Sequence, residues 1–79
     1  MYVRFLLDTK EKVELLTTMY EIPSFLPEKG DEIILNDIDN DYKHSTYKVI
    51  KRSIEYFFNE KETRKEPYEI KLYLKKIKK

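Results

Sequence analysis

Apolar and polar side chains alternate at every second position over residues 68–75 of this 79-residue chain. The apolar positions are Tyr68, Ile70, Leu72 and Leu74, and the positions between them are Glu69, Lys71, Tyr73 and Lys75. This period predicts a strand with one face in a core and the other in solvent. Pro67 precedes the strand, where its missing N–H does least harm. The lysine-rich residues 75–79 are expected to fray as a basic tail.

Residues 47–58 predict a second, longer strand whose apolar positions change parity. Tyr47 and Val49 share one face of such a strand, whereas Ile54, Tyr56 and Phe58 share the other. The change of parity near residues 51–53 predicts a bulge or a sharp bend, so that one strand serves two parts of a curled sheet. The charged residues 59–66 predict the loop that leads to the last strand.

The N-terminal segment predicts a hairpin. Residues 3–7 alternate as a strand. Residues 13–22 have two interpretations. Alternation from Val13 favours a second strand that pairs with the first, whereas Asp8 and Glu11 have the spacing of a helix capping box.

Turn residues separate this hairpin from the rest of the chain. Two prolines and Gly30, the single glycine of the sequence, predict a loop over residues 23–31 with a positive φ at the glycine. Residues 32–35 then predict a short strand, and the polar, acidic residues 36–45 predict a loop.

The composition favours sheet. The chain has no alanine and no glutamine, and 27 of its 79 residues are Val, Ile, Thr, Tyr or Phe. Five short antiparallel strands leave fewer open edges when they curl than when they lie flat. We therefore expect one all-β domain over residues 1–79, either a five-stranded small barrel or a strongly bent sheet.

Two motifs stand out in the sequence, the turn and strand LPEKGDEI at residues 26–33 and the later strand YKVI at residues 47–50. They resemble motifs of small SH3-like β-barrel proteins from bacteria and phage. The resemblance spans roughly residues 25–75 and implies an SH3-like barrel. Proteins of this kind commonly have no assigned function, so the resemblance supplies no site residue.

The net charge of +1 is unevenly distributed along the chain. Residues 1–41 carry ten acids and four bases, and residues 42–79 carry twelve bases and five acids. Acidic and basic strands could pair and neutralise each other, or the basic half could form a face for an anionic partner. The lack of cysteine, of a signal-like leader and of a long apolar run predicts a cytoplasmic protein.

The candidates for chemistry are weak. Asp37, Asp39 and Asp41 match the opening of a calcium loop, but Tyr42 stands where that loop needs glycine and Lys48 where it needs glutamate. His44 is the single histidine, and Asp41, Ser45 and Thr46 are near it in sequence, but closeness in a loop does not make a catalytic geometry, so a surface histidine is expected. One glycine cannot build a phosphate loop. We expect no catalysis, no metal and no cofactor.

Two sets of residues remain as candidate binding surfaces. The first, which predicts a protein interface or a homodimer contact, is Phe25, Leu26, Tyr56, Phe57 and Phe58. The alternative for the first two is a lid that folds over an open end of the barrel. The second set, which predicts a face for sequence-independent nucleic-acid binding, is Lys48, Lys51, Arg52, Lys71, Tyr73 and Lys75. The sequence predicts a non-catalytic interaction module, with a protein partner placed ahead of nucleic acid, and leaves the partner and the oligomeric state open.

Overall fold

The computed structural model describes residues 2–21, 26–61 and 67–77, and its described part contains five strands and no helix. The strands are β1 (Tyr2–Asp8), β2 (Val13–Met19), β3 (Glu32–Asp37), β4 (Lys43–Glu55) and β5 (Glu69–Lys76). The predicted all-β class is confirmed, and the ambiguous segment after the first turn is a strand. No helix in these residues is long and apolar enough to cross a membrane.

The strands form one sheet in the order β2-β1-β5-β4-β3. Three neighbouring pairs are antiparallel as expected, but β1 and β5 are parallel, with Val3 opposite Ile70 and Phe5 opposite Leu72. The expectation of a purely antiparallel sheet is wrong at this pair, because β5 enters the sheet from the same end as β1. Parallel neighbours occur where strands are well buried, and β1 and β5 together contribute five of the seven buried core residues in the described part of the chain.

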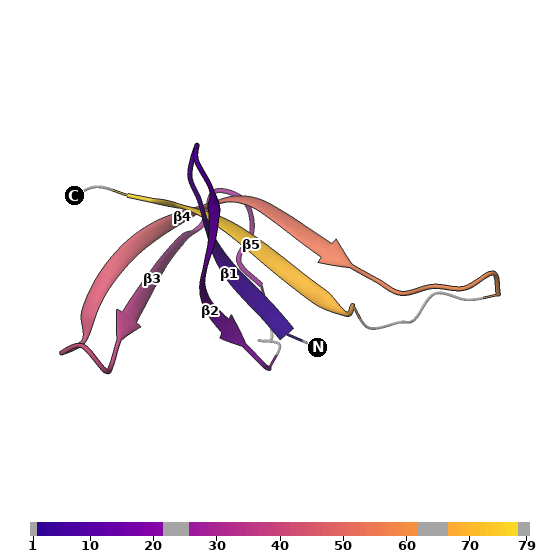
Figure 1. Ribbon diagram of the computed structural model, residues 1–79, viewed down its shortest axis with the longest axis horizontal. Coiled ribbons are helices and arrows are strands. Elements are labelled where there is room, and N and C mark those ends of the chain that lie inside the picture. The colour runs from indigo at the N-terminus through magenta and orange to yellow at the C-terminus, as the bar shows by residue number, and fades with distance from the viewer. Residues whose placement is uncertain (1, 22–25, 62–66, 78–79) are drawn as a thin grey trace.

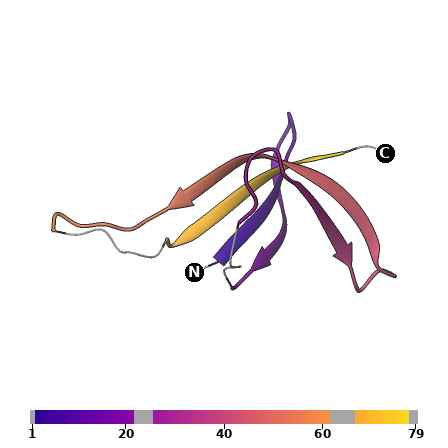
Figure 2. The same ribbon diagram turned by 180° about the vertical axis from the view of Figure 1, so that it is seen from behind.

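β4 bends in the middle, as the change of parity predicts. Its register with β5 shifts between Val49 and Lys51, which leaves Ile50 as the extra residue of a bulge. The first part of β4 runs beside β3 and the second part beside β5, so that the sheet arches over in Figures 1 and 2. The result is a half-barrel in which β2 and β3 are the edge strands of the described sheet.

The termini of these elements differ by a few residues from the predicted ones. β4 begins at Lys43 rather than Tyr47, and only a tight turn separates it from β3. β5 continues to Lys76, and the Ile77 N–H donates a hydrogen bond of 2.9 Å to the carbonyl oxygen of Thr46. Fraying from residue 75 is therefore not observed up to residue 77, and residues 78–79 lie outside the described part.

The predicted turn at Gly30 is confirmed. Gly30 has a φ of 100°, and its N–H donates to the carbonyl oxygen of Val49 at 2.8 Å. The Asp31 carboxylate accepts the Glu28 N–H at 2.7 Å, which closes the turn. This turn therefore holds the start of β3 against the bend of β4.

Alternation puts the core on the inner face of the half-barrel. Its buried residues are Val3, Phe5, Tyr47, Val49, Ile70, Leu72 and Leu74. Leu16 from β2 and Leu35 from β3 pack against this core but remain partly exposed. The centre of the sheet is thus well packed, and packing decreases toward the two free edges.

Candidate binding surface

The strand registers place most of the predicted nucleic-acid residues together on the outer face of the sheet. Lys48 is opposite Lys75, and Lys51 is opposite Tyr73. Lys71 has the same parity on β5 as Tyr73 and Lys75, so it also lies on this face. The Lys51 Nζ is 5.3 Å from the centre of the Tyr73 ring, close enough for a cation–π contact. We call these five residues the basic stripe.

Arg52 does not belong to the basic stripe. It is opposite Leu72 on the inner face, and its Nη1 donates to the carbonyl oxygen of Pro27 at 3.5 Å. The bulge lies at Ile50, so Lys51 and Arg52 follow the parity of the second part of β4 and point to opposite faces.

Four aromatic rings form a continuous row at one end of the same outer face. Tyr20, Tyr2, Tyr68 and Phe57 follow one another with centroid distances of 6.3, 5.8 and 4.5 Å. The exposed fractions of Tyr20, Phe57 and Tyr68 are 77%, 50% and 41%. The Tyr68 N–H donates to the carbonyl oxygen of Glu55 at 2.7 Å, which fixes the ring beside the end of β4. We call these four residues the aromatic row.

The predicted protein-interface residues are separated by the fold. Phe57 joins the aromatic row, and Tyr56 and Phe58 are exposed beside it, with Phe58 at 78%. Leu26 instead packs against the core, in agreement with the lid alternative, and Phe25 lies outside the described residues. Sequence patterns missed Tyr2 and Tyr20 because no spacing relates these positions. The prediction that Tyr68 lies on the core face of the last strand is wrong, because β5 begins only at Glu69 and the 41% exposed Tyr68 ring lies against Tyr2. The three tyrosines meet only through the pairing of β1 with both β2 and β5.

Arg4 connects the aromatic row to the basic stripe. Its Nε lies 2.9 Å from Oε1 of Glu69, whose side chain is 8% exposed. The contact is an ion pair without the alignment of a hydrogen bond, and this oxygen has no hydrogen-bond partner among the described residues. The Arg4 guanidinium carbon lies 5.1 Å from the centre of the Tyr2 ring. Charge on one side and a ring on the other therefore hold Arg4 in place.

The hydroxyls of Tyr2 and Tyr68 share a hydrogen bond of 3.3 Å, and each can donate or accept. The hydrogen bond with Tyr2 raises the pKa of the Tyr68 hydroxyl, and the negative charges of Glu69 and Glu55 raise this pKa further. The Tyr68 hydroxyl therefore stays protonated to a higher pH than that of an isolated tyrosine.

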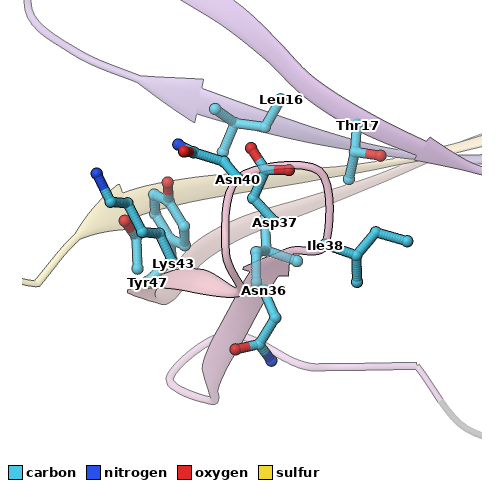
Figure 3. A pocket seen from close by; sticks show the side chains of 10 residues that line it. Leu16, Thr17, Asn36, Asp37, Ile38, Asn40, Lys43 and Tyr47 are labelled. Atoms are coloured by element: carbon cyan, nitrogen blue, oxygen red, sulfur yellow. The ribbon is translucent and has the colours of Figure 1, made fainter.

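A cavity opens on the inner side of the sheet, between the two edge strands. This cavity of about 560 Å³ is bordered by Leu16 of β2 and by Leu35 and Tyr47 across from it. Figure 3 shows Asp37, Ile38 and Lys43 around its mouth. The described residues contain no group of three or more acidic, histidine or cysteine side chains that could hold a metal ion. The Asp37 carboxylate instead accepts the backbone N–H of Asp39 at 3.1 Å, which stabilises the turn itself.

Comparison of the chain with protein-family models, with curated proteins and with solved structures finds no match. The resemblance to SH3-like barrel proteins of bacteria or phage therefore stays a prediction.

Proposed function

We propose that this chain is a non-catalytic binding module whose outer face holds single-stranded nucleic acid without sequence preference. The observation that supports this proposal is that the basic stripe and the aromatic row lie on the same face of one sheet. The residues predicted from the sequence for such a face include one ring, that of Tyr73. The fold adds the four rings of the aromatic row, so the lysines and the rings can act on the same ligand.

The two parts of the surface suit the two parts of a nucleotide. Lysine ammonium groups neutralise phosphates and release the counterions bound to them, which gives affinity without sequence readout. Exposed aromatic rings stack on bases, and they reach only bases that are not already stacked in a duplex. Charge and stacking hold a ligand without changing it, so the proposal includes no catalysis, no metal and no cofactor. We place this binding in the cytoplasm, which agrees with the lack of cysteine.

The test is the salt dependence of binding to a labelled oligothymidylate, followed by fluorescence anisotropy. Binding is expected at about 50 mM salt and should weaken as salt is added, because each phosphate contact contributes about 0.7 to the slope of log K against log salt. The double variant Lys51→Gln/Lys75→Gln should reduce the slope by about 1.4. The control Lys12→Gln/Lys43→Gln removes the same charge away from the basic stripe and should leave the slope unchanged. Absence of binding at about 50 mM salt contradicts the proposal.

A protein partner on the aromatic row is the second candidate, and the exposure of Tyr20 and Phe58 favours it. Aromatic residues and arginine are enriched at the centres of protein interfaces. A homodimer is its simplest form and is tested by light scattering over a range of protein concentrations. A dimer that persists at high salt and dissociates in Phe57→Ser/Phe58→Ser supports this candidate. A monomer at every protein concentration would rule out a homodimer as the second candidate.

A further inference from the structure

We infer that Arg4 and Lys71 form an oxyanion site that anchors one phosphate of the bound strand, at the junction of the aromatic row and the basic stripe. This inference rests on the proposed function and names the residues that orient the ligand on the outer face. Sequence patterns did not single out Arg4, because its surroundings come from the pairing of β1 with β5.

The Arg4 side chain is placed so that its terminal guanidinium nitrogens can donate hydrogen bonds to a ligand. Its Nε faces the buried carboxylate of Glu69, and its guanidinium carbon lies 5.1 Å from the centre of the Tyr2 ring. In the described part of the chain, the Arg4 side chain makes no other ion pair and no hydrogen bond, so its two terminal nitrogens are available. The side chain is 40% exposed. A guanidinium fork held in this way loses little freedom when it binds a phosphate through two parallel hydrogen bonds.

The local charge balance favours an anion at this position. Arg4 and Lys71 are direct partners across the parallel strands, and like charges in such a pair are unfavourable. Glu69 compensates one of the two positive charges and leaves one in excess. Glu55 lies opposite Glu69 on β4 and diagonal to Lys71 on the same outer face, so its charge opposes anion binding from the β4 side, although β5 separates it from Arg4.

The aromatic rings next to Arg4 indicate where the base of the bound nucleotide stacks. Tyr2 already has the Arg4 guanidinium over its ring, and it meets Tyr20 and Tyr68 edge-on, at interplanar angles of 64° and 62°. The Tyr68 ring also has Phe57 against it, at a centroid distance of 4.5 Å, so the open ring face beside the anchored phosphate belongs to Tyr20. A nucleotide whose phosphate sits on Arg4 and Lys71 can stack its base on this ring.

The test compares wild-type protein with Arg4→Lys and Lys71→Gln, using oligothymidylate in anisotropy titrations. Arg4→Lys keeps the charge and loses the fork, so affinity should fall about tenfold while the salt slope stays unchanged. Lys71→Gln should reduce the slope by about 0.7. Lys71 is partly exposed, so its variant remains informative if Arg4→Lys, next to buried Glu69, fails to fold.

NMR titrations with inorganic phosphate and with oligothymidylate give a second measurement of the same site. Both should shift the Arg4 Nε–H signal, and the oligonucleotide alone should also shift the ring signals of Tyr20. If the oligonucleotide binds while Arg4→Lys stays within about twofold of wild type, the inference is wrong and the proposed function stands. If the wild-type protein binds no oligonucleotide, the proposed function fails and the inference with it. Tighter binding of an acidic peptide than of the oligonucleotide also overturns the inference.

Discussion

On the inner face of the sheet, Val3, Leu72 and Leu74 have no exposed surface. On the outer face of the same strands, Arg4 and Tyr73 are partly exposed and Lys75 is exposed. Both sets come from alternate positions of β1 and β5, so shifting the register of these strands by one residue would exchange the two faces. The apolar side of each strand therefore fixes the register, and the register in turn decides which charges and rings become neighbours on the other side.

This comparison separates two kinds of position. Inner-face residues contribute to stability through burial, whereas outer-face residues are free to serve a ligand. Substitutions on the inner face should lower the free energy of unfolding, and substitutions on the outer face should lower affinity with little effect on folding.

The largest effect is expected at the centre of the core. Leu72→Ala should lower the free energy of unfolding by about 2–5 kcal/mol, because it removes a fully buried side chain and leaves a cavity. The exposed Ile34 on edge strand β3 provides the matched control, and Ile34→Ala should change stability by less than about 0.5 kcal/mol. Urea denaturation measures both values. Equal losses for the two variants would show that the inner face is not the core.

The next effect concerns stacking on the aromatic row. Tyr20→Ala should weaken oligothymidylate binding by about 1–3 kcal/mol, the range for the loss of one base stacked on a ring. Tyr42→Ala is the control, because Tyr42 is an exposed tyrosine in the turn before β4, outside the aromatic row. Anisotropy titrations at one salt concentration compare the two, and equal affinities would remove the aromatic row from the binding surface.

Two consecutive residues of β4 give the sharpest contrast between the faces. Lys51 lies on the outer face opposite Tyr73, and Arg52 lies on the inner face opposite Leu72. Lys51→Gln should reduce the salt slope by about 0.7, whereas Arg52→Gln should leave it unchanged although it removes the same charge. The slope of log K against log salt measures this difference. Equal slopes for the two variants would show that binding depends only on the total charge of the protein and not on the face.

The smallest effect is a gain of affinity. Glu55→Gln removes a negative charge from the outer face and should strengthen binding about twofold at low salt, with the gain lost as salt is added. Glu60→Gln, in the segment after β4, is the charge-matched control. Weaker binding by Glu55→Gln would show that this face does not attract an anion.

The sequence predicted the parts of the fold that depend on local alternation. The sequence predicts β5 and the bend of β4 because apolar residues recur at every second position and change parity at the bend. Local alternation does not predict the parallel pairing of β1 with β5, since this pairing joins segments from opposite ends of the chain. The β5 part of the basic stripe follows from alternation, but Lys48 and Lys51 have opposite parity and share the outer face only because of the bulge at Ile50. A bulge at Ile50 rather than near residues 51–53 reverses the face on which Arg52 lies.

The aromatic row and Arg4 could not be predicted, for the same reason as the parallel pair. Three different strand ends supply Tyr2, Tyr20 and Tyr68, and these strand ends meet at one end of the outer face. Each is an isolated aromatic residue in the sequence, and only the completed sheet makes them neighbours. Long-range pairing thus created the part of the surface that most favours a nucleic-acid ligand.

The most direct test of binding on the outer face is an NMR titration of the labelled protein with oligothymidylate at about 50 mM salt. The predicted result is a set of shifted signals that includes Lys51, Lys71 and Tyr20, with no shift at Leu35 in the cavity between β2 and β3. Shifts confined to that cavity, or no shift at all, would contradict a ligand site on the outer face.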